Sequence, residues 1–578
     1  MAVAGLLERD CHTTMPTQLD KDIHRITAAV TSPGQMFATK EVERRGVAMP
    51  AFVNAPPSLA HYFAHFCAQH RDALFLVDGD QRLTFGEVYD AALRVADGLA
   101  TRHGVRKGDR VGIAARNSAN WIVAYMGTIM AGGVATLLNG WWTGEELAYG
   151  VELCECSLVL ADAQRAARLA GHEHSATVHV FEHGVPAEGL AGVWAEGDTA
   201  MRMLGELGLS DLATILYTSG STGHPKGAYS DHLGVVSGIM NYICQTAMVL
   251  QILTERGEAP TVQPSALVTV PLFHVTGEIP VFLQSMALGR KLVLMPKWDA
   301  TEALRLLDSE KITYFVGVPL MSYEMAMHPD RDKYDLSQCK SFAAGGAPRP
   351  VEHVGKIKDA FPGGYPLLGY GLTETNAVGC GNLNENYMAK PGSTGLASKP
   401  LVDLAILDDD GRALAAGETG EVSIRSVCNF LGYWKNEEAT TAAYTGDGYF
   451  RTGDLGYLDE DGYLFIVDRK KDIIIRGGEN IACIEVEEAI YAHPDIAECS
   501  VFGLPDERFG EVPAAVYLVQ PGRQLTPEAL CDYLRGHIAA FKLPVHLWEA
   551  HEQLPRLGTQ KVDKRAVKAM YAKDFVPA

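Results

Sequence analysis

Hydrophobic and polar positions alternate in blocks along most of the chain. Short apolar runs at residues 74–77 (LFLV), 110–114 (RVGIA), 266–270 (ALVTV) and 291–295 (KLVLM) are separated by longer stretches of helical character. Short apolar runs that alternate with helices are typical of sheets covered by helices on their faces. The pattern therefore predicts an α/β protein built from layered sheets.

The alternation changes near residue 467, where a strand-like run meets the charged cluster at 468–472 (DRKKD). A charged cluster between two apolar runs favours an exposed domain boundary. We expect a large N-terminal domain over residues 1–467, in which residues 1–55 form an extension wrapped on the body. A hinge at 468–472 would join it to a small, mobile α+β domain over residues 473–578. With 578 residues, 47% of them hydrophobic, the chain can build several cores.

One segment is long and apolar enough to be considered as a membrane span. Residues 235–253 carry no charge, and a stretch of this length can cross a bilayer. Polar side chains such as Asn241 and Gln245 interrupt it, so it is interpreted as a buried core helix and no transmembrane segment is expected. The N-terminal residues also lack the charged and then apolar pattern of a secretory signal.

Charge and cysteine content exclude some partners and compartments. The chain has 50 basic and 71 acidic side chains, and its net charge of -21 opposes binding to nucleic acid or anionic lipid. Eleven cysteines are scattered without the spacing of a zinc site or a disulfide framework. We therefore expect a reducing, cytoplasmic location. Association as a homodimer is left open.

A glycine- and hydroxyl-rich loop follows a predicted buried strand at 212–217 (LATILY). In residues 218–227 (TSGSTGHPKG), three glycines let the backbone approach a ligand, while four hydroxyls and a lysine offer donors to phosphate oxygens. The loop is not a P-loop of the GxxxxGK[ST] type, since Pro225 and Gly227 stand where glycine and Ser or Thr would be needed. A plain surface turn is the alternative, and the strand before the loop favours a phosphate site.

This loop, with the tyrosine before it (YTSGSTGHPKG, 217–227), resembles the signature loop of AMP-forming acyl-CoA synthetases and their adenylate-forming relatives. Further segments resemble motifs of that family, and they stand in the family's order between about residues 80 and 565. They are 271–277 (PLFHVTG), 345–348 (GGAP), 370–375 (YGLTET), 449–454 (YFRTGD), 468–472 (DRKKD) and 555–561 (PRLGTQK). The chain is identified as a member by this ordered set.

The resemblance implies an acid–thiol ligase. Such an enzyme uses MgATP to convert a carboxylic acid into an acyl-adenylate and pyrophosphate, then transfers the acyl group to coenzyme A and releases AMP. The expected substrate is a small-molecule acid, fatty or otherwise hydrophobic. Alternatives are an aryl-CoA ligase, luciferase-like oxidation, or acyl loading of a carrier-protein thiol. A catalytically inactive nucleotide-binding protein is the alternative from a different class.

By the same resemblance, most of the nucleotide site can be assigned to residues. Thr373 would hydrogen-bond the α-phosphate, and Glu374 would bind Mg²⁺, although a helix cap is its simpler reading. Asp454 would accept the ribose hydroxyls with help from Arg469, although an aspartate after glycine is usually a turn residue. The phosphates are assigned to Thr218, Ser219, Gly220, Ser221, Thr222, Gly223 and Lys226, and the adenine to Gly346, Ala347, Pro348 and Tyr370.

The resemblance assigns the remaining roles to residues around the acid and the thiol. Lys561 would contact the carboxylate and the α-phosphate, with Gln560 standing where the family usually has glycine. His274 would flank the acyl pocket, although a lone histidine is more often an interior polar group. Lys471 would be the hinge residue, and Gly478 would line the coenzyme A channel. The acyl pocket is assigned to Thr276, Gly277, Val316, Gly317, Gly345, Gly371 and Val378, which are small and mostly apolar and suit an aliphatic or bulky hydrophobic acid.

Overall fold

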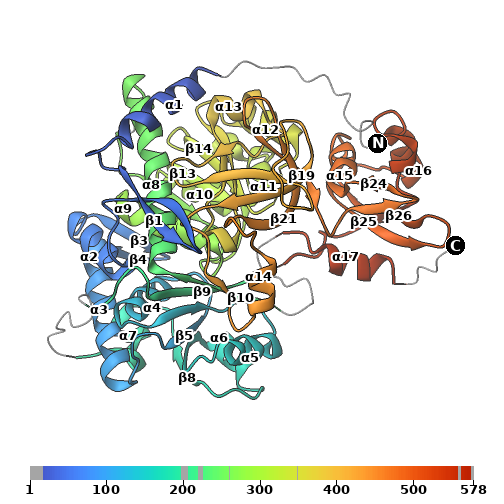
Figure 1. Cartoon of the computed structure of the whole chain (residues 1–578). Helices are drawn as coiled ribbons and strands as arrows, with labels where there is room; N and C mark the ends of the chain where they lie inside the picture. The colour runs from blue at the N-terminus through green and yellow to red at the C-terminus, as the bar shows by residue number, and fades with distance from the viewer. Residues whose placement is uncertain are drawn as a thin grey trace.

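The computed structural model describes residues 17–196, 206–218, 225–259, 261–347, 349–557 and 561–573. Figure 1 shows a large body of sheets and helices with a smaller C-terminal part at its side. The small part begins after β22 and contains α15, α16 and α17 with the last strands. The expected fold class, a large layered α/β domain with a small α+β domain, is confirmed.

A nine-stranded sheet forms the centre of the large body. Its strand order is β17-β16-β15-β14-β13-β11-β12-β3-β4, and the six strands from β15 to β3 are parallel. The strands are β3 (Leu74–Asp78), β4 (Gln81–Thr84), β11 (Ser265–Val268), β12 (Lys291–Leu294), β13 (Tyr314–Gly317), β14 (Ser341–Gly345), β15 (Tyr365–Tyr370), β16 (Cys380–Asn382) and β17 (Leu396–Ala397).

A seven-stranded sheet forms the second layer, in the order β20-β10-β9-β6-β5-β7-β8. It is parallel from β9 to β8, whereas β9 and β10 form an antiparallel hairpin. Its strands are β5 (Arg110–Ala114), β6 (Val134–Leu137), β7 (Leu158–Asp162), β8 (Thr177–Phe181), β9 (Leu212–Thr218), β10 (Lys226–Asp231) and β20 (Gly432–Tyr433).

Three smaller sheets complete the protein. The N-terminal hairpin pairs β1 (Thr39–Arg44) with β2 (Val47–Phe52), and a four-stranded sheet pairs β18 (Asp403–Leu407), β19 (Gly420–Arg425), β21 (Phe450–Leu458) and β22 (Leu464–Arg469). The small part contains β23 (Ile474–Arg476), β24 (Glu479–Ile481), β25 (Ile496–Asp506), β26 (Gly510–Val519) and β27 (His546–Ala550).

Helices cover the sheets and join them through one large apolar core. The core includes side chains of α2, α3, α4 and α8 together with inward residues of both large sheets, such as Phe75 and Ile113. The helices are α1 (Gln18–Val30), α2 (Leu59–Gln69), α3 (Phe85–Arg102), α4 (Ala119–Met130), α5 (Gly144–Leu153), α6 (Ala163–Leu169), α7 (Pro186–Gly189), α8 (His232–Glu255), α9 (Gln284–Ala287), α10 (Ala300–Ser309), α11 (Pro319–Ala326), α12 (Val351–Ala360), α13 (Asn384–Ala389), α14 (Glu437–Ala442), α15 (Cys483–Tyr491), α16 (Pro527–Leu534) and α17 (Lys564–Tyr571).

The uncharged segment at 235–253 lies within α8. Among the described residues, α8 is the one helix long and apolar enough to be a candidate membrane span, and 56% of its most apolar 18-residue window is buried within the protein. Its side chains belong to the large apolar core. The interpretation as a buried core helix agrees with this packing.

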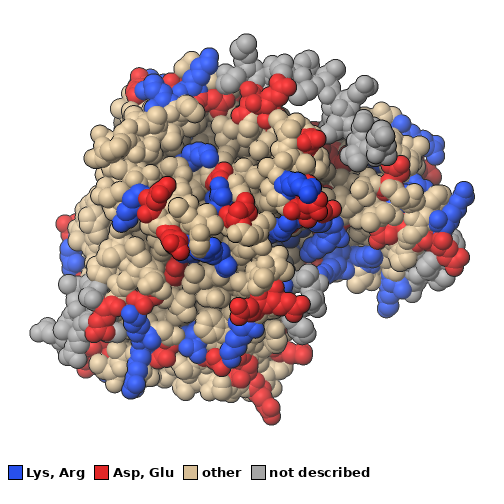
Figure 2. All heavy atoms as spheres, in the orientation of Figure 1, with Lys and Arg blue, Asp and Glu red and all other residues tan. Residues whose placement is uncertain are grey.

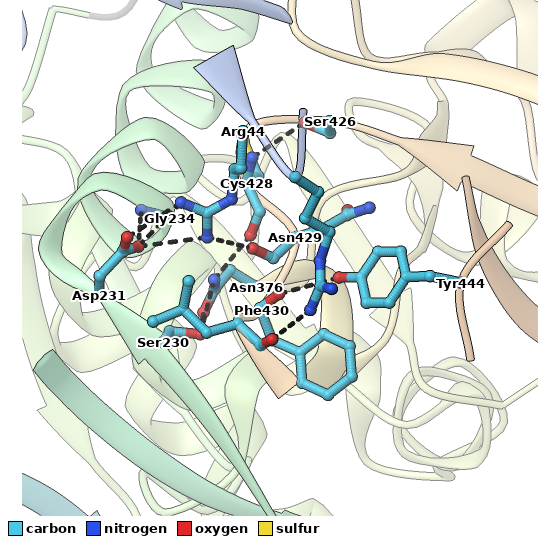
Figure 3. A network of polar contacts seen from close by, with 12 residues as sticks. Arg44, Ser230, Asp231, Gly234, Asn376, Ser426, Cys428, Asn429, Phe430 and Tyr444 are labelled. Atoms are coloured by element: carbon cyan, nitrogen blue, oxygen red, sulfur yellow. Dashed lines mark hydrogen bonds and ion pairs between the residues drawn. The ribbon is translucent and has the colours of Figure 1, made fainter. Parts of the chain in front are cut away.

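A buried ion pair ties the N-terminal hairpin to the hairpin of the second sheet (Figure 3). Arg44, at the end of β1, donates from Nη1 to Asp231 Oδ2 at 3.0 Å, and both side chains are 7% exposed. Arg44 Nη2 also donates to the carbonyl of Asn429 at 2.6 Å. Asp231 ends β10 and begins α8, because its Oδ1 accepts the backbone N–H of Gly234 at 2.9 Å. One guanidinium therefore fixes three separate segments.

Replacing Arg44 by alanine is expected to lower the free energy of unfolding by about 3–5 kcal/mol, because Asp231 would be left buried without its counter-ion. Urea denaturation followed by circular dichroism measures the loss. The neighbouring Arg45 provides a matched control, since it is exposed and donates to the carbonyl of Leu431. The central carbon of its guanidinium lies 3.7 Å from the centroid of the Tyr444 ring. Arg45→Ala should cost about 1 kcal/mol or less. Equal losses in the two variants would contradict the role given to Arg44.

Candidate active site

The predicted phosphate loop is held between the paired ends of a hairpin. Thr218, the last residue of β9, lies opposite Lys226, the first residue of β10. Residues 219–224 lie outside the described residues, and they include the assigned Ser219, Gly220, Ser221, Thr222 and Gly223. The register of the two strands nevertheless brings both ends of the loop to the same edge of the second sheet, as a phosphate cradle between strands requires.

Tyr433 contacts both Lys226, the residue at which β10 begins after this loop, and Glu374. The ammonium nitrogen of Lys226 lies 4.9 Å from the centroid of the Tyr433 ring, and the Tyr433 hydroxyl donates to Glu374 Oε1 at 2.9 Å. Burial raises the pKa of the Glu374 carboxyl, which is 8% exposed, and the hydrogen bond from Tyr433 opposes that rise. The structure thus places Lys226 and Glu374, both assigned to MgATP, on two sides of one phenol.

The backbone that carries Thr373 and Glu374 is a single 3₁₀ turn (η4, Thr373–Thr375), and the next residue is left-handed. Asn376 has φ 49°, a conformation that asparagine tolerates better than most residues. Its Nδ2 donates to the carbonyl of Cys428 at 2.7 Å and to Ser230 Oγ at 3.1 Å (Figure 3). The Phe430 N–H also donates to the Glu374 carbonyl at 2.8 Å. The turn is therefore anchored to β10 and to the segment that contains Arg44's partner Asn429.

Asp454 is the second buried carboxylate of the site. It lies in β21 opposite Arg469 of β22, and Arg469 Nε approaches Asp454 Oδ1 at 3.1 Å. The hydroxyl of Tyr370, at the end of β15, donates to Asp454 Oδ2 at 2.7 Å. Burial raises the pKa of Asp454, while Arg469 and Tyr370 stabilise its charged form. The structure brings together these three residues, which the resemblance assigned to ribose and adenine.

Lys561 reaches the same region from the C-terminal part of the chain. A Cβ added to Gly346 would lie 2.9 Å from Lys561 Cε, so the side chain passes directly over the GGAP segment, in which Gly346 has φ 78°. Pro348 of this segment lies outside the described residues, as does Gln560. Burial lowers the pKa of Lys561 to about 8; Arg469 lowers it further, and Asp454 opposes the shift. Its ammonium group therefore titrates nearer to neutral pH than that of an ordinary lysine.

The backbone at Lys561 is the base of a short antiparallel turn. The Leu557 N–H donates to the Lys561 carbonyl at 2.8 Å, and Arg556 and Val562 form a bridge. Glu498 of β25, which is 4% exposed, accepts from Arg556 Nη2 at 2.7 Å. This buried ion pair fixes the turn to the small domain.

His274 lies on the loop after β11, close enough to Lys561 for the two to interact electrostatically. Burial, followed by the charge of Lys561, lowers the pKa of His274 to about 3. The Nδ1 atom accepts the backbone N–H of Thr276 at 3.3 Å, which leaves Nε2 as the nitrogen that carries the proton. The imidazole is therefore neutral near pH 7 and can donate one hydrogen bond, but it cannot supply positive charge.

A cavity of about 1320 Å³ opens from the GGAP segment and follows the face of the nine-stranded sheet. Residues of β13, β14 and β15 form its floor. One side of α8 and one side of α1 form its roof. Of the residues assigned to an acyl pocket, Thr276, Val316, Gly345 and Gly371 line it, whereas Gly277, Gly317 and Val378 are not among its lining residues.

The predicted hinge cluster is only partly exposed. Residues 469–471 are exposed, but the side chain of Asp468 is 2% exposed, because its Oδ2 accepts the Cys483 N–H at the start of α15 and Oδ1 accepts the Arg469 N–H at 2.7 Å. Burial raises the pKa of Asp468 to about 6. The expectation of a wholly exposed cluster was wrong at this residue. Figure 2 shows basic side chains gathered where the two domains meet, on a face of otherwise mixed charge.

Gly478 lies apart from the residues around Lys561. It is exposed in the turn between β23 and β24 with φ 91°, and a Cβ there would meet nothing within 4 Å among the described atoms. The small domain contacts the large one through Gln520, whose Nε2 lies 3.5 Å from the Tyr323 hydroxyl, and through the rings of Tyr491 and His353. The present arrangement therefore brings Lys561, and not the Gly478 turn, to the residues assigned to the nucleotide.

Sequence reasoning missed residues that hold the site together. Tyr433 is far in sequence from both Lys226 and Glu374, and nothing in its local sequence indicates a polar role. Asn376 could have been suspected, since asparagine directly after a short helical turn is a common left-handed residue. Arg44 and Asp231 are 187 positions apart, and a long-range ion pair leaves no pattern in one sequence.

Together, the hairpin loop, the two buried carboxylates and the lysine from the small domain define a two-domain, nucleotide-binding α/β enzyme. The chain belongs to the AMP-binding enzyme family, whose model matches residues 63–434, and the family's C-terminal domain matches residues 485–561.

Similar proteins include a long-chain-fatty-acid–CoA ligase of Bacillus subtilis (strain 168), 32% identical over 84% of this chain and 89% of its own length. A feruloyl-CoA synthase of an Amycolatopsis species is 33% identical over 85% of this chain and 95% of its own. Among solved structures, o-succinylbenzoate coenzyme A synthetase of Bacillus subtilis in complex with ATP and magnesium ion is similar, with a TM-score of 0.73 and 27% identity over 88% of this chain and 99% of that one.

Replacing Tyr370 by phenylalanine is expected to weaken ATP binding about 10-fold or more, because the phenol no longer orients Asp454 or stabilises its charge. Calorimetric titration of ATP measures the dissociation constant. Tyr449→Phe is the matched control, since its hydroxyl donates to the carboxylate of Asp403, also at 2.7 Å, outside the residues assigned to the nucleotide. Equal weakening by both variants would show that loss of any such bond, rather than of the Asp454 contact, causes the effect.

Proposed function

We propose that this protein is an AMP-forming carboxylate–CoA ligase, which activates an acid as its adenylate and then transfers the acyl group to coenzyme A. The observation that carries the proposal is the position of Lys561, which reaches from the small domain over Gly346 beside the carboxylate of Asp454. An inactive nucleotide-binding protein would have no need of a desolvated cation at this point. The names of the relatives support the transfer to coenzyme A.

The triphosphate binds at the hairpin between Thr218 and Lys226, where the ammonium group and the backbone of the loop meet it. Mg²⁺ would bind with the triphosphate, and the Glu374 carboxylate offers it a hard oxygen ligand. Within the described residues, no group of three or more His, Cys, Asp or Glu side chains could hold a metal ion by itself. A cation held by one carboxylate and the phosphates of a substrate is the usual arrangement for Mg²⁺. When bound, it screens the charge of the phosphate oxygens.

The nucleoside binds across the end of β15 and the middle of β21. Asp454 accepts the two ribose hydroxyls, and its carboxylate is held in place by Tyr370 and Arg469. The adenine lies between the GGAP segment and the ring of Tyr370. Thr373, at the start of the 3₁₀ turn, donates its hydroxyl to the α-phosphate.

In the first half-reaction, an oxygen of the substrate carboxylate attacks the α-phosphorus of ATP, and the bond to pyrophosphate breaks. Negative charge on the α-phosphate increases in the transition state, and Lys561 supplies the matching positive charge in a site with little water. His274, which is neutral, donates one hydrogen bond near the carboxylate. No side chain forms a covalent bond with the substrate.

In the second half-reaction, the thiol of coenzyme A attacks the carbonyl of the adenylate and AMP leaves. We propose that the small domain first rotates about Lys471 in the hinge at 468–472, between the large domain at 1–467 and the lid at 473–578. The rotation would withdraw Lys561 and bring the Gly478 turn to the thiol channel, where the lack of a side chain leaves room for the pantetheine arm.

We propose a cytoplasmic enzyme that acts on a small-molecule acid. The ten described cysteines are free thiols, and nine of them are buried, which suits a reducing compartment. The relatives act on both fatty and aromatic acids according to their names, so both classes belong in a substrate screen.

Acid-dependent exchange of labelled pyrophosphate into ATP tests adenylation, and AMP formation with coenzyme A tests the complete reaction. Lys561→Ala should slow the exchange about 100- to 1000-fold, while thioester formation from added acyl-adenylate should remain. Lys568→Ala is the matched control, because this exposed lysine of α17 donates to the Gly503 carbonyl away from the site. Loss of both half-reactions in Lys561→Ala would contradict its role, and absence of exchange with every acid would contradict the proposed function.

The pH dependence of adenylation should report the titration of Lys561. The ammonium group carries its charge below its pKa of about 8, so kcat/KM for ATP is expected to fall as the pH rises through about 8. In Lys561→Arg the guanidinium stays charged over this pH range, so the fall of kcat/KM near pH 8 should disappear. This holds even if the variant is much slower than the wild type. A fall at the same pH in the arginine variant would assign the titration to another group.

A further inference from the structure

The cavity contains a buried cation that the proposed mechanism does not use. Arg290 lies between α9 and β12, is 7% exposed and lines the cavity. Within the described part of the chain, its Nε and Nη1 atoms have no hydrogen-bond partner. Its guanidinium lies over the ring of Tyr314, with 4.7 Å between the central carbon and the ring centroid. Burial lowers the pKa of Arg290, but a guanidinium remains protonated near neutral pH.

Among the buried arginines described, Arg290 differs from the others because it lines the cavity and makes no ion pair. Arg44 is paired with Asp231, and Arg165 with Asp162. Arg349 also has no carboxylate partner and its Nε and Nη1 are unpartnered, but its Nη2 donates to Ser322 and to a backbone carbonyl, and it does not line the cavity. A buried charge without a counter-ion is strongly unfavourable, and such groups are normally paired or bound to a ligand. Arg290 lines the cavity without a counter-ion among the described residues, and an anion bound in the cavity would supply one.

The sheet register places Arg290 far from the reaction centre. Tyr314 begins β13 and lies beside Ser341, the first residue of β14, whereas the adenylate site is at Gly345 and Gly346, the other end of β14. Four residues of a strand span ~13 Å. Between these ends the cavity is lined mainly by apolar side chains, among them Val316, Ala343, Leu367, Val249 and Leu253. The cavity thus combines an apolar middle with a cationic far end, where Arg290 is the buried cation and Lys340 and Lys358 also line the space.

We propose that Arg290 binds an anionic group at the distal end of the substrate acid, so that the preferred substrates are long acids with a second, distal carboxylate. This inference rests on the proposed function, because it assumes that the first carboxylate is activated near Lys561. The planar guanidinium offers two parallel donors that match a carboxylate. Its contact with the Tyr314 ring holds it in one orientation. An ordinary fatty acid would fill the apolar middle and leave the charge of Arg290 uncompensated.

The test compares straight-chain monoacids and α,ω-diacids of equal length, over a series of lengths, by AMP formation with coenzyme A. For the wild-type enzyme, kcat/KM should favour the diacid at one range of lengths, where the second carboxylate reaches Arg290. In Arg290→Met, kcat/KM for that diacid should fall about 10- to 100-fold, while kcat/KM for the monoacid stays the same or rises.

Arg256→Met is the matched control, since Arg256 lines the same cavity but is already paired with Glu385 at 2.8 Å. It should leave the ratio of diacid to monoacid unchanged. Arg290→Lys keeps the positive charge but not the two parallel donors, so it should give a ratio of diacid to monoacid activity between those of the wild type and Arg290→Met. If Arg290→Met does not fold, the ratio in Arg290→Lys tests the inference. Equal activity on both acids at every length in the wild type, or an equal loss for both acids in the Arg290 variants, would overturn the inference. Absence of AMP formation with every acid would instead overturn the proposed function.

Discussion

The buried ion pair between Arg44 and Asp231 is the contact on which the arrangement of the large domain depends. Asp231 ends the strand that follows the phosphate loop and begins α8, the helix that roofs the cavity. Arg44 belongs to the N-terminal hairpin and also binds the backbone at Asn429, next to the segment that anchors Glu374. The loop assigned to phosphate, the carboxylate of Glu374 and the cavity therefore share one fixed point. Because both charges are almost fully buried, breaking the contact would leave each charge buried without a counter-ion, which is strongly unfavourable.

Much of the fold could be predicted from the sequence, because local patterns specify it. The apolar runs at 74–77, 110–114 and 291–295 are strands, as expected, since short runs of this kind suit a sheet covered on both faces. The motif residues Tyr370, Asp454 and Arg469 meet in space because each stands at a strand end or on a paired strand. Their roles toward the nucleotide remain predictions.

The residues that could not be predicted make contacts with residues far away in the sequence, or are buried where their sequence neighbours favour exposure. Tyr433 contacts Glu374 only because β20 is added to the edge of β10, a pairing of strands about 200 residues apart that no local pattern specifies. Asp468 is charged and sits in a charged cluster, which favours exposure, yet the start of α15 offers it a backbone N–H inside the protein. Arg290 could not be recognised as unusual, because a single arginine between apolar residues does not show whether a carboxylate lies nearby.

The helix α1 forms part of the cavity roof, yet it precedes residue 63, where the match to the family model begins. It is attached to the body by Leu19 and Ile26, which are buried in the large apolar core, and by polar contacts such as the one between Arg25 and Glu255 and the one between Asp20 and Tyr463. Mutations on its cavity side can therefore reshape the cavity without changing the residues assigned to chemistry. Substitutions in such a segment, whether natural or engineered, can alter the preference for substrates while the residues assigned to catalysis stay unchanged.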